Sequence, residues 1–514
     1  MDWYLRSWTQ WISCFKNQHA ARCRRAACED DNHNDGDIRT PVVIGSGTVK
    51  IIKPLMSSQV NTSNRIRQTF RFGWRLLAAS YAHVNRLTHH ALGWVLMAVL
   101  VGYFLFCGVF LSLRYVVLPN IDHYKPEVEK AASYFVARPV TIKTIHASWR
   151  GLHPSLRLND VVIHNQQGDP ALVLPEVSAT LSWWSVLAGE LSLYTLEVSR
   201  PDLEIERDEQ GHIFIAGLLL DTDKPSNGRG LDWLLSQREI VIRNGWVRWL
   251  DKQRGAPPMV LTNVDFLLQN KWRSHRVALK ATPPVELAAP IDLRAAFTHP
   301  AFASRRSDFT QWSGELYADW RNTNLDSWKQ YVDYPFELSG GRGAIRAWIN
   351  FDHGVVHDFA ADLGLSDLTV RLEPQLSPLK LVEVSGRIAG GEVAAGLKQQ
   401  LLSFGDHGHT LELSNFSLRT DQGTVLPSTT VSSTFTAAKQ GRLEQHELKI
   451  SALDLDTLAQ LARHLPLSNQ ERQMLADFAP KGAVKDFSAQ WAGSTPGAGN
   501  YRLRGKFADL ALQP

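Results

Sequence analysis

Residues 406–409 (DHGH) are the strongest candidate for a metal-binding cluster, because carboxylate and imidazole groups are common ligands of zinc. A zinc site needs three or four ligands that a rigid element presents together, whereas the Asp and Gly of this cluster favour a turn between strands. Three cysteines between positions 14 and 28, with His19 among them, also lie close together, but their spacing matches no common zinc finger. We therefore predict that the chain holds no metal.

The sequence also lacks the motifs that mark a catalytic or phosphate-binding site. Residues 45–48 (GSGT) are rich in glycine, but no Lys-Ser or Lys-Thr step follows them and no strand-helix-strand pattern surrounds them. Residues 340–343 (GGRG) favour a turn before a strand. Neither G-x-S-x-G nor H-E-x-x-H occurs. The chain is therefore predicted not to be an enzyme and to use no cofactor.

Charge and cysteine content narrow the class of protein further. The 514 residues carry 55 Lys+Arg and 51 Asp+Glu, and the positive excess lies before residue 91. A nucleic-acid-binding protein is basic in its folded part, so this class is excluded. All four cysteines lie at or before Cys107. A disulfide scaffold and a cysteine-ligated metal are therefore excluded from the rest of the chain, which is long enough for roughly three domains.

Ala91 to Leu113 is an uncharged apolar run that ends at Arg114. As a helix with a rise of ~1.5 Å per residue it would extend about 34 Å, enough to cross the ~30 Å hydrocarbon core of a membrane. The residues at its exit are not small, so we predict an uncleaved transmembrane helix rather than a signal peptide. The aromatic side chains expected to anchor it in the membrane are Trp94, Phe104, Phe106, Phe110 and Tyr115.

The charges that precede this helix predict its orientation. Residues 56–90 contain several arginines, and no acidic residue occurs between Asp37 and Asp122. The positive-inside rule therefore places the N-terminus in the cytoplasm and, in a bacterium, the bulk of the chain in the periplasm. We interpret residues 56–90 as a basic cytoplasmic leader. Residues 1–55 lack periodicity and are predicted to be a poorly ordered extension upstream of a translation start at Met56.

Beyond the anchor, the period of the apolar residues changes from that of a helix to that of strands. Ile121 to Ala137 has apolar residues at three- and four-residue steps and is predicted to be one amphipathic helix. From residue 140 onward, apolar and polar residues alternate in roughly nineteen segments separated by Gly, Pro, Asn and Asp, which predicts an antiparallel all-β architecture. Residues 221–231 form the clearest linker.

A divergent repeat divides the strand-rich part. A helical stretch that begins at Leu325 is followed by a strand from Gly343, and a stretch that begins at Leu455 is followed by a strand from Gly482. The last copy ends before the strands that complete the earlier one, so we expect the chain to be the N-terminal part of a longer protein. The expected modules are 114–220, 232–374 and 375–514.

A long sheet with one apolar side must cover that side with a second layer, close into a barrel or fill it with a ligand. The pattern leaves two architectures open: two packed sheets with a closed core, or a curled sheet whose concave face is an elongated apolar groove. A groove would suit lipid acyl chains, because a 16-carbon chain gains on the order of 12 kcal/mol on leaving water. The candidate groove-lining residues are Leu156, Leu158, Val277, Leu279, Leu411, Leu413, Leu448 and Ile450.

Residues 161–218 resemble the N-terminal region of AsmA-like proteins. The resemblance is carried by Leu174-Pro-Glu-Val177, by the turn with Trp183 and Trp184, by Gly189-Glu-Leu191 and by the run from Pro201 to Gly211. Within that family the chain looks most like the large YhdP proteins, to which the block from Leu453 to Trp491 is also similar. The resemblance covers roughly residues 90–514.

The resemblance implies a mainly β protein with a single N-terminal transmembrane helix, a long curled antiparallel β-sheet that forms an elongated apolar groove, and a few short amphipathic helices. It implies an inner-membrane protein that moves phospholipids between the inner and outer membranes and supports the outer-membrane permeability barrier. The implied partners are phospholipid acyl chains, the inner membrane and proteins at the far ends, without nucleic acid. A second function stays open, namely a TamB-like assembly or insertion factor for outer-membrane proteins.

Overall fold

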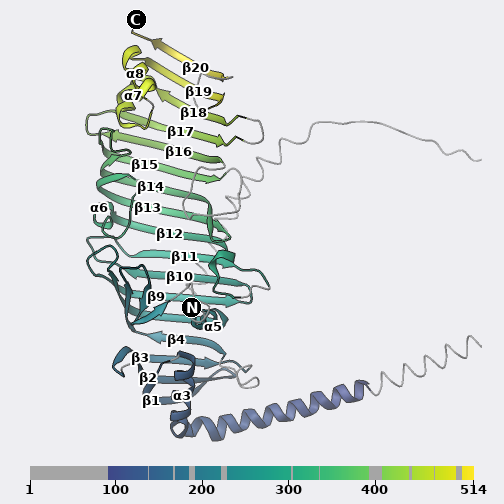
Figure 1. Ribbon diagram of the computed structural model, residues 1–514. Helices are drawn as coiled ribbons and strands as arrows, with labels where there is room; N and C mark the ends of the chain where they lie inside the picture. The colour runs from purple at the N-terminus through teal and green to yellow at the C-terminus, as the bar shows by residue number, and fades with distance from the viewer. Residues whose placement is uncertain are drawn as a thin grey trace, which may run out of the picture. The chain divides into compact units, whose positions relative to one another are not determined.

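The computed structural model describes residues 91–136, 138–165, 168–183, 192–220, 229–301, 305–334, 336–392, 408–438, 443–467, 469–493 and 501–513. The expected N-terminal extension (1–55), the basic leader (56–90) and most of the expected linker (221–231) lie outside these residues. Figure 1 shows the order in which the described helices and strands follow one another. The division of the strand-rich part into modules stays a prediction.

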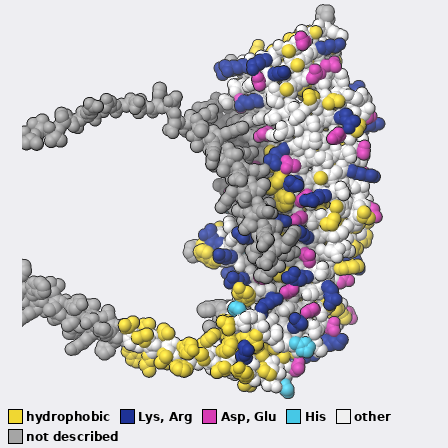
Figure 2. Space-filling view, turned by 180° about the vertical axis from the view of Figure 1, so that it is seen from behind, with side chains coloured by type: hydrophobic (Ala, Val, Ile, Leu, Met, Phe, Trp, Pro, Cys, Tyr) yellow, Lys and Arg dark blue, Asp and Glu magenta, His cyan; other side chains and the backbone are white. Residues whose placement is uncertain are grey.

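One long helical segment precedes the sheet. Residues 91–112 are α-helical, and the segment continues through η1 (Leu113–Val117) and η2 (Leu118–Tyr124) into α3 (Lys125–Val136). Ala91–Tyr134 is long and apolar enough to cross a membrane, and Figure 2 shows hydrophobic side chains gathered over the helix. The apolar helix expected from residue 91 is confirmed. The amphipathic helix expected from Ile121 is divided between η2 and α3.

All described strands belong to one 20-stranded sheet. The first strands are β1 (Val140–Arg150), β2 (His153–His164), β3 (Pro170–Leu181), β4 (Leu193–Ser199), β5 (Asp202–Arg207), β6 (Ile213–Ile215) and β7 (Leu218–Leu220). They are followed by β8 (Glu239–Asp251), β9 (Met259–Lys271), β10 (Ser274–Thr282), β11 (Ile291–Thr298), β12 (Ser313–Asn324), β13 (Glu337–Asp352) and β14 (Val355–Arg371). The last are β15 (Leu379–Glu392), β16 (Gly408–Thr420), β17 (Val425–Thr436), β18 (Gln445–Asp454), β19 (Lys481–Ala492) and β20 (Tyr501–Ala511).

The sheet is mostly antiparallel, which corrects the expectation of a purely antiparallel one. Antiparallel pairs follow the chain order from β1 to β4 and again from β8 to β20. β8 joins the two parts because it pairs in parallel with β4 along its first half and with β5 along its second half. Parallel pairing requires a long crossover connection, and residues 208–238 provide it with the β6–β7 hairpin and α5 (Arg229–Ser236).

Asparagine and aspartate residues with positive φ interrupt many strands. They are Asp160, Asn244, Asn263, Asn322, Asp367, Asn415, Asp486 and Asp509. Register shifts between Ile242 and Gly245 and between Leu413 and Phe416 show that such a residue adds an unpaired position. Each register shift lets two residues three positions apart face the same side of the sheet and bends the strand locally. The pairing around Asp160 and Asp367 keeps its register.

Glycines on the next strand lie opposite some of these positive-φ residues. A Cβ on Gly340 would lie 2.5 Å from the carbonyl oxygen of Asp367, and one on Gly482 would lie 2.6 Å from that of Asp509. Gly340 to Gly343 were expected to form a turn, but they lie inside β13. The reason is that Gly340 leaves room for the carbonyl group of Asp367 in β14, which a side chain at this position would meet.

Hydrophobic clusters form where helices lie on the sheet. Residues of η2 and α3 pack on Ile142 and Ile145 of β1. α5 contributes Leu235 to a second cluster. α6 (Leu325–Trp328) and α7 (Leu455–Leu461) contribute Leu325 and Leu461 to the cluster over β13 to β16. The remaining short helices are η3 (Phe309–Gln311), η4 (Ala462–His464) and α8 (Asn469–Phe478).

Candidate functional site: the apolar face of the sheet

Cross-strand pairing divides the sheet into two faces, because residues that pair directly point to the same side. Two rows of paired residues cross the strands on one side, which we call the apolar face. Row 1 consists of Ile145, Leu158, Val177, Val198, Ile242, Phe266, Leu279, Leu293, Ala318, Ala347, Ala361, Ile388, Leu413, Val431, Ile450 and Phe487. Row 2 consists of Ala147, Leu156, Ala179, Leu196, Ile240, Leu268, Val277, Ala295, Leu316, Ile349, Phe359, Gly390, Leu411, Ser433, Leu448, Ala489 and Leu503.

Both rows are apolar almost without interruption. Row 1 holds only apolar residues from β1 to β19, and the one hydroxyl in row 2 is that of Ser433. All eight residues expected to line a groove lie in these rows. Leu158, Leu279, Leu413 and Ile450 belong to row 1, and Leu156, Val277, Leu411 and Leu448 belong to row 2. Their contact with lipid stays a prediction.

The exposure of the apolar face differs between strands. In row 1, Ile145 is 1% exposed beneath η2 and α3, whereas Leu413 and Ile450 are half-buried. In row 2, Leu411 is 42% and Leu503 is 60% exposed. Among the described residues no second sheet packs on either row, since all their strands belong to the same sheet. An apolar surface that is partly open in this way can accept a hydrophobic ligand.

The opposite side, which we call the polar face, is held by ion pairs between neighbouring strands. Arg387 in β15 donates two hydrogen bonds to Asp362 in β14, at 2.6 and 2.9 Å, and its guanidinium lies 5.3 Å from the ring of Trp348. Arg157 in β2 pairs with Glu176 in β3 at 3.3 Å. Figure 2 shows basic and acidic side chains interspersed along the sheet. The sheet therefore separates a charged side from an apolar one.

Aromatic rings join the apolar helix to the first strands of the sheet. Phe106 lies 4.9 Å from Trp183, and Phe110 lies 5.0 Å from Trp149, between ring centres. Trp149 follows Ala147 of row 2 on the same side of β1. The apolar surface of the helix thus continues into the apolar face at this point.

The five residues expected to anchor the helix fall into two groups. Trp94, Phe104 and Tyr115 are 74%, 64% and 68% exposed. Phe106 is 39% exposed and Phe110 is half-buried, because these two rings pack on the tryptophans of the sheet. The first group is free to contact a bilayer, whereas the second also forms the junction with the sheet. Membrane insertion of the five residues stays a prediction.

Sequence reasoning missed a set of histidines on the apolar face. His275, His299, His409 and His446 each have a buried ring nitrogen without a hydrogen-bond partner. So does His153, which pairs with Arg150 and lies on the other side of β2 from row 2. Burial lowers the pKa of His275 to about 4, with smaller contributions from the charges of His299 and Arg306. The ring is therefore neutral at neutral pH and compatible with an apolar surface. Strand alternation could have placed His275 beside Val277 of row 2, two positions later.

His409 belongs to the only metal candidate that the sequence offered after the anchor. It lies at the start of β16, with its ring 5.4 Å from that of Phe435. Asp406 and His407 lie outside the described residues. Within the described ranges, no three His, Cys, Asp or Glu side chains come together as a metal site would require. The His409 ring packs against Phe435 of the neighbouring strand.

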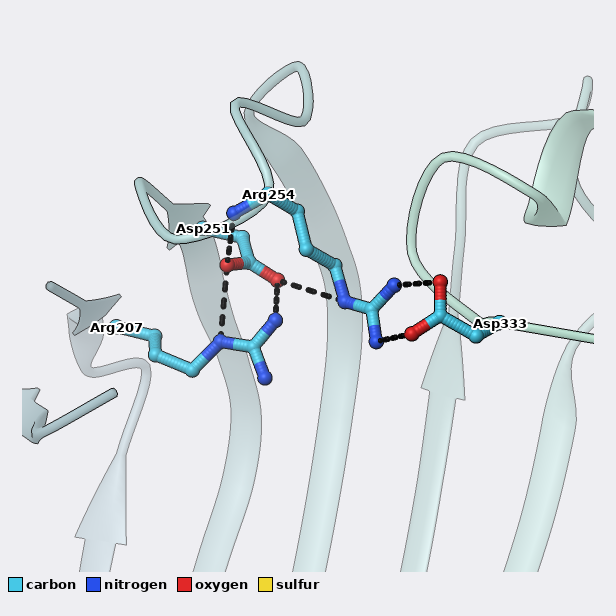
Figure 3. A network of polar contacts seen from close by, with 4 residues as sticks. All are labelled: Arg207, Asp251, Arg254 and Asp333. Atoms are coloured by element: carbon cyan, nitrogen blue, oxygen red, sulfur yellow. Dashed lines mark hydrogen bonds and ion pairs between the residues drawn. The ribbon is translucent and has the colours of Figure 1, made fainter. Parts of the chain in front are cut away.

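A charged network ties β5 and β8 to the segment between α6 and β13 (Figure 3). Arg207 donates two hydrogen bonds to Asp251, which is 3% exposed. The backbone N–H of Arg254 donates to Asp251 at 3.2 Å, and its guanidinium pairs with Asp333. Burial opposes the charge of Asp251, but the hydrogen bonds from Arg207 and Arg254 hold the pKa of its carboxyl below the usual value. This network stabilises the sheet rather than a ligand.

A comparison with known protein families identifies the family of this chain. Residues 77–514 match the family model described as YhdP protein. The chain belongs to the YhdP family. No curated protein and no solved structure matches it. The YhdP match begins ahead of the apolar helix and takes in both rows of the apolar face. The resemblance seen in the sequence is thereby confirmed.

Proposed function

We propose that this YhdP-family protein is a lipid-transfer conduit anchored in the bacterial inner membrane. Its N-terminus lies in the cytoplasm, and the sheet curls in the periplasm into an elongated groove lined by rows 1 and 2. The groove moves phospholipids between the inner and outer membranes and so supports the outer-membrane permeability barrier. The observation that carries this proposal is the unbroken apolar row from Ile145 to Phe487.

The composition of row 1 suits transfer better than tight binding of one ligand. A 16-carbon acyl chain gains on the order of 12 kcal/mol when it leaves water for an apolar surface. Because every position of row 1 is apolar, the acyl chain stays in contact with apolar side chains as it moves from strand to strand. A polar side chain within the row would create a barrier, and none occurs between Ile145 and Phe487. The proposed role needs no catalytic group.

Site-specific photo-crosslinking of the full chain in cells tests the proposal. A crosslinker at Leu413 or Ile450 faces the apolar side, and one at Glu412 or Lys449, in the same strands, faces the opposite side. We expect phospholipid adducts at the first two positions and none at the matched controls. Equal lipid capture on both faces would refute the proposal. Capture of polypeptide alone at Leu413 and Ile450 would establish the TamB-like assembly function instead.

A further inference from the structure

One arginine at the junction between helix and sheet differs from its neighbours. Arg114 directly follows the apolar run, one turn after Phe110. The guanidinium carbon lies 5.4 Å from the ring centre of Trp149 and 6.0 Å from that of Phe110. The side chain is exposed. The cation is thus held above the rings where the apolar helix meets the apolar face.

No carboxylate of the described residues forms an ion pair with Arg114, although nearby arginines of the sheet are neutralised in this way. Arg157 pairs with Glu176 at 3.3 Å, and Arg243 pairs with Glu197 at 2.5 Å. A guanidinium that interacts with aromatic rings through its charge keeps N–H groups available for other partners. Arg114 therefore presents a positive charge and free donors beside an apolar surface.

The position of Arg114 along the helix indicates which anion it meets. The apolar run of Ala91 to Leu113 is about as long as the hydrocarbon core is thick, so the next residue lies at the level of the lipid headgroups. Exposed Tyr115 follows, and tyrosine favours this interface. The anion that is abundant at this depth is the phosphate of a phospholipid. Arginine binds phosphate through two parallel N–H groups.

We infer that Arg114 is a binding site for the phosphate of a phospholipid whose acyl chains pass Trp149 onto the apolar face. This inference rests on the proposed function and adds a selectivity step at its entrance. Lipids without a phosphate, such as diacylglycerol, offer no anion to Arg114 and enter less readily. The charged group is selected at the junction, while rows 1 and 2 accept any acyl chain.

The test uses the full chain reconstituted in phosphatidylcholine vesicles that contain equal traces of labelled phosphatidylcholine and labelled diacylglycerol. One photo-crosslinker replaces Leu152, which is 70% exposed and whose carbonyl accepts a hydrogen bond from Trp183 at the junction. A second replaces Leu413 in row 1. Each is combined with Arg114→Gln, with Arg114→Lys and with the control Arg157→Gln on the polar face. Protease protection verifies that every variant is inserted.

In the unsubstituted protein we expect phospholipid adducts to exceed diacylglycerol adducts by about tenfold at Leu152, as one charge-assisted contact allows. Arg114→Gln should reduce that ratio to about one, Arg114→Lys should retain part of it, and Arg157→Gln should leave it unchanged. An unchanged ratio in Arg114→Gln would overturn the inference and leave Arg114 as an interfacial anchor only. Absence of lipid at Leu413 in the unsubstituted protein would instead refute the proposed function itself.

Discussion

Replacement of Gly386 by alanine tests whether the bulges maintain the apolar face. Gly386 lies in β15 with φ near +142°, and a Cβ there would lie 2.7 Å from the Cα of Phe416 and 3.0 Å from the carbonyl oxygen of Asn415. Backbone strain at such a position costs about 1–3 kcal/mol, and a contact this close costs about as much again. We therefore expect Gly386→Ala to destabilise the β15–β16 pair by roughly 3 kcal/mol.

Hydrogen–deuterium exchange of the full chain in detergent measures this loss of stability strand by strand. A local measurement is needed because different parts of a long sheet open separately. A loss of roughly 3 kcal/mol should accelerate exchange in peptides of β15 and β16 about 100-fold. Gly364 in β14 provides a matched control, because its φ is not positive and a Cβ there meets nothing within 4 Å. Equal protection of β15 and β16 in Gly386→Ala and Gly364→Ala would refute the role assigned to the bulge.

Four further outcomes are expected. Asn415→Ala should cost about 1 kcal/mol of local stability by exchange, whereas Asn415→Gly should be near neutral, because φ at this position is +50°. Asp251→Asn should lower the local stability around β8 by about 2–4 kcal/mol, measured as faster exchange, because it leaves Arg207 without its carboxylate. Since the pKa of Asp251 is lowered on folding, the stability that this carboxylate provides is present above pH ~4 and is lost as the pH falls further. Since the pKa of His275 falls from 6.5 to about 4 on folding, protease resistance should decline between pH 6.5 and 4, by at most about 1.4 kcal/mol per pH unit, and His275→Gln should remove this slope. Leu413→Asp should abolish the outer-membrane barrier function in cells while the anchor remains inserted, and a normal barrier to large antibiotics in a stably expressed variant would count against the conduit.

Local signals in the sequence predicted the parts of the fold that depend on neighbours in the chain. Alternation placed Leu413 and Ile450 on one side of their strands, and the register confirms that they share row 1. The repeat placed helices at Leu325 and Leu455, where Asn324 and Asp454 accept hydrogen bonds from the first turns of α6 and α7. Such signals are readable because the interacting groups lie only a few residues apart.

The features that were missed depend on more distant partners. Asparagine and aspartate were interpreted in general as residues that separate strands, yet Asn415 and Asp367 lie inside β16 and β14 with positive φ. Their signal was present, because each stands between two residues that face the same side three positions apart, such as Leu413 and Phe416. The parallel pairing of β8 with β4, and the contact of Phe106 with Trp183, join segments that no local pattern connects.

The bulges and the two rows are parts of one arrangement. Asn244, Asn415 and Asp486 each lie within two positions of a row 1 residue, on the side away from row 2. Each of these bulges bends its own strand locally. α6 and α7 pack over Leu365, Leu368 and Leu381, whereas η2 and α3 cover part of row 1 and α5 covers part of row 2. A sheet that needed only a closed core would gain nothing from keeping sixteen strands apolar at the same level, because helices placed over each cluster would suffice. The proposed conduit would account for that continuity, because an acyl chain that moved along the sheet would meet an apolar residue at every strand.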